Sequence, residues 1–194
     1  MHRYHNQYRI PSARAVWWHY GWAGAYFITI CTRKREHLFG EIRGGDMHLS
    51  HAGLLADVFW HEIPNHARNT ELGAFVVMPN HIHGILILNH PAPVGDNTVP
   101  VETRHALSLQ NAEPAFGKTI AQSRFQNQRK NTVSSIIGGY KSAVTKHARR
   151  LQLSFGWQAR FHDHIIRNDA EYQKINDYIE TNVQNWDKDR FYEP

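Results

Sequence analysis

Two strongly apolar runs, 74–77 and 85–88, flank a polar stretch, Met78-Pro79-Asn80-His81-Ile82-His83-Gly84, near the middle of the chain. The length and composition of these runs predict two neighbouring β-strands, with the Pro-Asn pair as the break between them. Side chains two positions apart in a strand point to the same face of a sheet. His81 and His83 are therefore expected to project together from one strand.

Periods of two and of 3.6 residues predict the other elements along the chain. In order, they are a strand at 24–32, a hairpin from about 38 that includes 47–49, a helix at 50–66, the central strands at 71–78 and 81–89, a helix at 132–151, a strand at 157–167 and a helix at 169–186. This order predicts an α+β fold of the ferredoxin-like (split βαβ) type. Such a fold has an antiparallel sheet with helices on one face, here with an added C-terminal helix.

Two segments lack a sustained period. Residues 90–131 contain four prolines and many polar residues, which predicts a surface insertion. Residues 1–22 mix basic and aromatic residues and are interpreted as an N-terminal arm. With these appendages, the whole of 1–194 is expected to form a single domain.

Composition narrows the class of protein. A hydrophobic content of 41% argues for a globular protein, and Lys and Arg exceed Asp and Glu by 22 to 17, which suits a polyanionic partner. The single cysteine, Cys31, excludes an internal disulfide framework and favours a reducing compartment. Because no apolar run approaches about 20 residues, no membrane span is expected, and a cytoplasmic location is predicted.

The histidine pair has two interpretations. Two imidazoles held side by side on a rigid strand make a ready metal site or a catalytic pair. Since the chain has 15 histidines, the pair is equally consistent with two ordinary polar residues on a solvated strand face. A second His-x-His pair, His162 and His164, is expected to face DNA or to be structural, and a second metal site is the alternative.

The last predicted helix carries a tyrosine outside its apolar stripe. Tyr178 lies on the flank of that stripe, and Asn182 follows one turn later on the same face. A phenol is a possible nucleophile and an amide oxygen a neutral ligand for a hard cation, but the same pattern also fits a half-buried edge residue and a solvated amide. The rival tyrosines, Tyr140 and Tyr172, align with apolar positions of their helices, which predicts core roles.

Four blocks of the chain, in order, resemble the single-tyrosine HUH transposases, and most closely the branch of REP-associated tyrosine transposases. The blocks are Pro79-Asn80-His81-Ile82-His83-Gly84, Tyr140-Lys141-Ser142-Ala143-Val144-Thr145, Trp157-Gln158 with Phe161-His162-Asp163-His164-Ile165-Ile166-Arg167, and Asp177-Tyr178-Ile179-Glu180-Thr181-Asn182. The resemblance extends over about residues 22–187. The sequence departs from the family in its long insertion and in Val183, which stands where a proline often follows the amide.

The resemblance implies a DNA transposase that cuts single-stranded DNA next to hairpin (REP-like) sequences and transfers the strand. It implies that His81 and His83 bind a divalent cation, Mg²⁺ or Mn²⁺, and that Asn182 completes this metal site. Tyr178 corresponds to the nucleophile, whose attack would give a 5′-phosphotyrosine. The family includes monomers and helix-swapped homodimers, so either state is expected.

Basic residues are the expected contacts to DNA phosphates. They are Arg33, Lys34, Arg35, Lys141, Lys146, Arg149, Arg150, Arg160 and Arg167. Two alternatives stay open at this point: a non-catalytic DNA-binding protein on the same scaffold, and an unrelated metallohydrolase that uses the histidine pair.

Overall fold

The computed structural model of the chain describes residues 22–89 and 132–192. The predicted insertion at 90–131 lies outside these residues, as does all of the predicted N-terminal arm except Trp22. Both segments, and the organisation of the chain as one domain, therefore stay predictions. In the described ranges, no helix is long and apolar enough to cross a membrane.

The described elements follow the predicted order closely. They are β1 (Gly24–Cys31), η1 (Arg33–Arg35), β2 (Gly40–Arg43), β3 (Asp46–Leu49), α1 (His51–His61), α2 (Ile63–His66), β4 (Thr70–Val77), β5 (His81–Leu88), α4 (Val133–Arg150), β6 (His162–Ile166), α5 (Asp169–Glu180) and η2 (Trp186–Lys188). The predicted α+β class is confirmed. The main strands and helices follow one another in the order β1, α1, β4, β5, α4 and β6.

Four strands form one antiparallel sheet in the order β4-β5-β1-β6, while β2 and β3 pair as a separate hairpin. β5 lies between β4 and β1, so hydrogen bonds hold it on both sides, and almost all of its residues are buried. A register shift between Leu72 and Phe75 marks a bulge in β4. The strand that carries His81 and His83 is therefore an inner strand of the sheet, constrained along both edges as β1 is.

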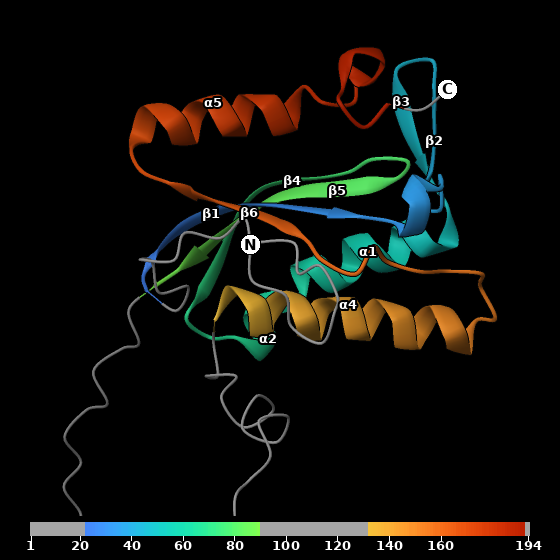
Figure 1. The fold of residues 1–194 in the computed structure, drawn as a ribbon, viewed down its shortest axis with the longest axis horizontal. Coiled ribbons are helices and arrows are strands. Elements are labelled where there is room, and N and C mark those ends of the chain that lie inside the picture. The colour runs from blue at the N-terminus through green and yellow to red at the C-terminus, as the bar shows by residue number, and fades with distance from the viewer. Residues whose placement is uncertain (1–21, 90–131, 193–194) are drawn as a thin grey trace, which may run out of the picture.

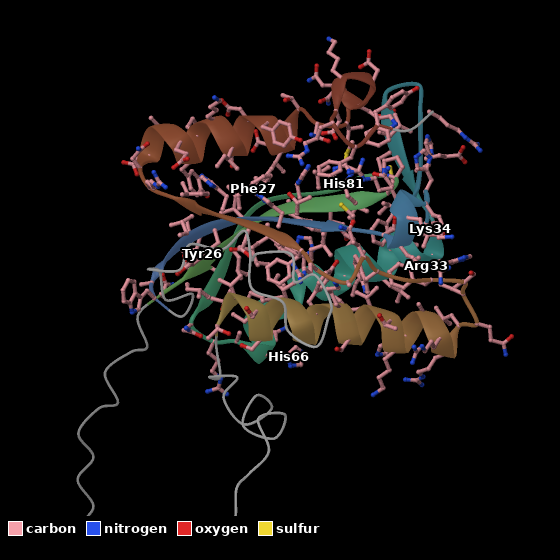
Figure 2. All side chains as sticks on the ribbon, viewed as in Figure 1. Tyr26, Phe27, Arg33, Lys34, His66 and His81 are labelled. Atoms are coloured by element: carbon pink, nitrogen blue, oxygen red, sulfur yellow. The ribbon has the colours of Figure 1, made fainter. Side chains whose placement is uncertain are left out.

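The sheet separates two layers of helices, as Figure 1 shows: α5 covers one face, and α1 with α4 covers the other. The alternation along β1 decides which side chains meet which layer. Tyr26 belongs to the larger core with α1 and α4, whereas Phe27 packs in the smaller cluster under α5 (Figure 2). In that smaller cluster Ile179 of α5 is buried against Ile85, and each such side chain contributes roughly 1.5–3 kcal/mol by leaving water.

Three polar side chains set the beginnings of the long helices. The Ser50 hydroxyl accepts a hydrogen bond from a backbone N–H in the first turn of α1, Thr132 forms a capping box at α4, and Asn168 caps α5. These caps lie within one residue of the helix starts that the sequence predicts. The predicted and observed boundaries differ at the ends of elements that no cap and no periodic pattern marks.

Three predicted boundaries are wrong. The helix expected at 50–66 is divided, because Pro64 lies in the first turn of a separate α2. The last strand begins at His162, since Trp157 makes only an isolated bridge to Thr32. The final helix ends at Glu180 instead of 186, and the chain beyond it turns back through η2.

Glycine has different roles at two places. At Gly138 and Gly139 of α4, an added Cβ would meet no atom of the described residues within 4 Å, so close packing does not require these two glycines. At Gly84, directly after His83, an added Cβ would collide with the buried ring of Trp60. The glycine of the polar stretch is therefore required by packing against α1.

Candidate active site

His81 and His83 lie side by side on β5, on the face of the sheet that α5 covers. Their ring centroids are 4.4 Å apart, and both side chains are almost completely buried. The register places His81 opposite Cys31 and His83 opposite Thr29 on β1. The sequence prediction that the two imidazoles project together agrees with this arrangement, and Figure 2 labels His81 on this face.

Each imidazole is held through its Nδ1 atom. Nδ1 of His81 lies 2.8 Å from Oδ1 of Asn80, and Nδ1 of His83 lies 2.8 Å from the hydroxyl of Thr29. The Asn80 amide is itself fixed, because its Nδ2 donates to the carbonyl of Phe191 at 2.8 Å. Such partners orient a ring and select its tautomer, so Nε2 is the nitrogen that each histidine presents to a ligand.

The surroundings keep both imidazoles neutral. Burial, followed by the positive charges of Arg35 and Arg190, lowers the pKa of His81 to about 3. Burial and then the neighbouring His81 lower the pKa of His83 well below its ordinary value. Neutral imidazole is the form that binds a metal, so protons do not compete for these nitrogens near neutral pH.

Tyr178 of α5 reaches the histidine pair from above the sheet. Its hydroxyl lies 3.2 Å from Nε2 of His83 and donates to Oδ2 of Asp189 at 2.7 Å. The side chain is 38% exposed, and its ring meets Phe27 edge-on. Burial, then the hydrogen bond to and the charge of Asp189, raises the pKa of the phenol well above its ordinary value, so the resting group is protonated.

The rival tyrosines do not reach this place. Tyr140 is buried on the other side of the sheet, where its hydroxyl donates to the carbonyl of Ala56 at 3.0 Å. Tyr172 packs with the small cluster between α5 and the sheet. Both occupy the packed positions that the helical pattern indicates, which leaves Tyr178 as the tyrosine beside the histidines among the described residues.

Asp189 is a site residue that sequence reasoning missed. One ligand atom from each of His81, His83 and Asp189 lies within 4.8 Å of the others, and the described residues hold a single group of this kind. The same carboxylate accepts from Nδ2 of Asn182 at 3.1 Å and from the backbone N–H of Phe191 at 2.7 Å. It therefore joins the amide, the phenol and the histidines into one cluster.

No motif marks Asp189, since it lies in an aperiodic segment after the last helix. A helix continuing to 186 would have carried this segment away from the sheet. The observed helix ends at Glu180, and η2 returns the chain so that Asp189 faces His83. Asn182 is accordingly not on a regular helix, although it still approaches Tyr178 through the shared carboxylate.

The cluster fits a divalent cation. Among the described residues, Nε2 of His81 and Oδ1 of Asn182 are buried without a hydrogen-bond partner, which is costly for polar atoms unless a ligand satisfies them. Two imidazole nitrogens, an amide oxygen and a carboxylate make a mixed nitrogen and oxygen donor set for such a cation. The four residues predicted for the site, Tyr178, His81, His83 and Asn182, are thus brought together at one place.

The nine basic residues are not brought together. Lys141, Lys146 and Arg149 line a shallow cavity of about 510 Å³ on α4, and Arg150 is exposed nearby, so this group lies across the sheet from His81 (Figures 1 and 2). Arg160 and Arg167 are exposed before and after β6. Because β6 runs antiparallel to β1, Arg167 lies at the end of the sheet away from the histidines.

The remaining three basic residues, Arg33, Lys34 and Arg35, form η1 at the histidine end of β1 (Figure 2). Lys34 and Arg35 adopt left-handed backbone angles, with φ of 54° and 55°, which costs non-glycine residues about 1 kcal/mol or more each. Hydrogen bonds from Thr32 to the carbonyls of Glu36 and Asn80 hold this turn. The turn carries the Arg35 guanidinium to 5.1 Å from the ring centre of Phe191, at the edge of the cluster.

The second histidine pair divides into two different environments. His164 contacts the Glu171 carboxylate at 2.7 Å, which ties β6 to the start of α5. His162 lies in register with Thr29, in the same cross-strand row as His83, and it is exposed. This agrees with a structural role for His164 and a site-facing one for His162, and the described residues show no second metal group.

Comparison with known proteins places this geometry in context. The chain aligns with the solved structure of a REP-associated tyrosine transposase bound to a REP hairpin, at a TM-score of 0.51 and 21% identity over 89% of this chain and 72% of that one. A more distant solved structure, of a transposase candidate from Deinococcus radiodurans R1, aligns at a TM-score of 0.41 with 14% identity over 90% of this chain and 97% of that one. No family model matches the chain.

The chain therefore has the fold of the REP-associated tyrosine transposases, and the resemblance read from its four sequence blocks is confirmed at that level. It is also 32% identical over 182 residues to a Haemophilus influenzae protein described only as uncharacterized, covering 93% of this chain and 92% of that protein. This chain belongs to the family of that Haemophilus influenzae protein.

Proposed function

We propose that the protein is a metal-dependent endonuclease and strand transferase for single-stranded DNA, of the REP-associated transposase type, which cuts next to a hairpin. The observation that carries this proposal is the contact between the Tyr178 hydroxyl and Nε2 of His83, in a chain with the transposase fold. A nucleophile beside imidazoles that can bind a metal is an arrangement suited to phosphodiester transesterification.

The cation would be held by His81, His83 and Asn182, with Asp189 as a further ligand. When bound, a divalent cation supplies Lewis-acid charge that polarises a phosphate oxygen and steadies a departing oxygen. Asn80 and Thr29 would keep the imidazoles in the ligating orientation through their contacts to Nδ1. The amide and carboxylate oxygens suit Mn²⁺ or Mg²⁺, the cations that the family resemblance of the sequence implies.

Tyr178 would attack the phosphorus of the scissile phosphodiester. A bond forms between the phenol oxygen and phosphorus, and the bond from phosphorus to the 3′-oxygen breaks. The phenol proton passes to the Asp189 carboxylate, its present acceptor, and the 3′-oxygen takes up a proton from solvent water to become a hydroxyl. One phosphate ester replaces another, so the 5′-phosphotyrosine keeps the energy for rejoining a strand.

A single chain supplies all of these groups. The contact from Tyr178 to His83 is made within one chain, so no exchange of α5 between subunits is needed to complete the site. A swapped α5 would make the same contact from a partner subunit, so a monomer and a helix-swapped homodimer both fit the proposed site. The positive turn at Arg33–Arg35 would guide DNA phosphates to the site, and the basic face of α4 would bind the hairpin on the other side of the sheet.

The test is cleavage of labelled hairpin oligonucleotides with varied single-stranded flanks, in Mn²⁺ or Mg²⁺. We expect a covalent protein–DNA adduct that mass spectrometry maps to Tyr178, and we expect the Tyr178→Phe variant to lose it. Tyr140→Phe is the matched control: it removes one buried hydrogen bond, at about 1 kcal/mol of stability, and should keep the adduct.

Two results would contradict the proposal in different ways. Hairpin binding without any adduct would identify a non-catalytic DNA-binding protein on the same scaffold. Metal-dependent hydrolysis that survives Tyr178→Phe and leaves no adduct would identify a metallohydrolase that uses the histidine pair alone.

A further inference from the structure

A cavity of about 350 Å³ opens beside Tyr178, on the side of the histidine pair toward β6. It is bounded by the sheet on one side and by the returning C-terminal segment on the other. Besides Tyr178, the residues outside the metal cluster that line it are Phe27, Thr29, His162, Lys188, Arg190 and Phe191. Pockets for small ligands run from about 300 to 1,000 Å³, so this one has room for a single compact group.

Two of the walls are aromatic. Phe27 is half-buried on β1, with its ring centre 6.2 Å from that of Tyr178 and 5.1 Å from that of His83 (Figure 2). Phe191 lies across the cavity, with its ring 5.9 Å from that of His83. Phe191 is buried and the guanidiniums of Arg35 and Arg190 lie over its ring. Phe27 is therefore the flat apolar surface that can receive the face of a planar ring, and every nucleobase has such a face.

Positive charge lines the open side. Lys188 and Arg190 are both exposed, and the Arg190 guanidinium lies 4.8 Å from the ring centre of Phe191. The carboxylate in this wall, Asp189, already accepts hydrogen bonds from Tyr178 and from the backbone of Phe191. The wall therefore suits an anionic group such as a phosphate next to the aromatic surface.

His162 adds a polar contact at a fixed position. It lies opposite Thr29, which itself lies opposite His83, so the three side chains form one row across β6, β1 and β5. Imidazole offers a donor and an acceptor nitrogen, which is the chemistry that distinguishes base edges. An aromatic surface, cations and a directional polar group together are the features of a nucleotide subsite.

We propose that this cavity binds the nucleotide adjoining the scissile phosphate, with Phe27 as the surface on which its base stacks. His162 contacts the edge of that base and is therefore a specificity-determining residue. Lys188 and Arg190 contact the phosphate. The identity of the ligand as part of a DNA strand rests on the proposed function. The cavity itself binds a nucleotide whether or not cleavage follows.

The test uses the full chain and 2-aminopurine deoxyribonucleoside 5′-monophosphate, whose fluorescence is quenched when the base stacks. We expect saturable quenching with the wild type. Phe27→Leu should weaken binding by roughly 5- to 150-fold, the loss expected for one base–aromatic stack. Phe27→Tyr keeps the ring and should retain the affinity. Phe59→Leu, which shortens a half-buried phenylalanine on the opposite face, is the matched control and should bind like the wild type.

Equal affinity of the wild type and Phe27→Leu, or absence of saturable quenching, would overturn the subsite. If Phe27→Leu does not fold, as judged by circular dichroism, His162→Ala decides the matter: it should alter the ranking of the four natural nucleotides as competitors, and an unchanged ranking overturns the specificity role. The cleavage test is independent, because nucleotide binding without a Tyr178 adduct would reject the proposed function and still support the subsite.

Discussion

The hydroxyl of Tyr178 lies 3.2 Å from Nε2 of His83, although the two residues are 95 positions apart in the chain. Two independent features of the fold produce this contact. β5 is fixed by neighbours on both sides, and α5 is anchored on the same face of the sheet by Ile179. A rigid strand and a packed helix thus hold the phenol and the imidazole in place before any substrate binds.

Replacement of Asp189 by asparagine should weaken metal binding. The substitution keeps the shape of the side chain but removes the negative charge next to His81 and His83. We expect the affinity for Mn²⁺, measured by isothermal titration calorimetry, to fall by at least about tenfold. Asp187→Asn, an exposed residue two positions away, is the control and should leave the affinity unchanged. Equal affinities of the two variants for Mn²⁺ would show that Asp189 is not a ligand of the metal.

Thr29→Val should also weaken metal binding, although Thr29 is not a ligand. Its hydroxyl lies 2.8 Å from Nδ1 of His83, and valine has the same shape without the hydroxyl. Loss of such an orienting contact typically costs about 10- to 100-fold in metal affinity. The same titration measures it, with Thr181→Val as the control, because that hydroxyl bonds only to helix backbone. A wild-type affinity in Thr29→Val would show that burial alone orients the ring.

The parts of the site that could be predicted are those encoded locally. Strand alternation is enough to place His81 and His83 on one face, and helical spacing is enough to separate Tyr178 from the buried Tyr140. Asp189 could not be found in this way, because its position depends on where α5 ends and how the chain turns back. The polar surroundings of Asn182 are likewise a product of that return, not of helical periodicity.

The basic residues show the same distinction. The prediction that Arg33–Arg35 follows a strand is correct, and the turn lies at the histidine end of β1. The residues on α4 belong to the opposite layer of the fold, which only the packing of α4 against the other face of the sheet reveals (Figure 1). The sequence identifies the basic side chains, but it does not show that they are distributed over two surfaces of the fold.

Gly84→Ala should destabilise the fold. A Cβ at this position would overlap the Trp60 ring, which is fully buried and stacked on Phe75, so the ring has little room to move. Overpacking of this kind costs about 1–3 kcal/mol, measurable by urea unfolding. Gly138→Ala is the control: its Cβ would meet no described atom within 4 Å, and alanine favours the helix by up to about 1 kcal/mol. Equal stability of the two variants would contradict the packing role of Gly84.

Acid should destabilise the metal-free protein through its buried histidines. The pKa of His81 is about 3 in the folded chain, against an ordinary value of 6.5, because burial disfavours the charged ring. Between these values the unfolded chain binds a proton that the folded chain does not. His81 therefore stabilises the fold fully above about pH 6.5, and each pH unit below that costs about 1.4 kcal/mol until about pH 3. The lowered pKa of His83 acts in the same direction.

The expected result is a free energy of unfolding that falls by about 2 kcal/mol from His81 alone between pH 6.5 and 5, measured by urea titration with a chelator present. His81→Gln removes this group. The free energy of unfolding of this variant should therefore change with pH by about 1.4 kcal/mol less per pH unit over that interval, the slope due to one proton. His66→Gln, at an exposed position on α2, controls for the loss of a histidine as such and should keep the wild-type slope. A slope shared by all three proteins would mean that His81 is protonated in the folded chain. Protons would then compete with a cation for Nε2 throughout this range, and metal binding would weaken as the pH falls.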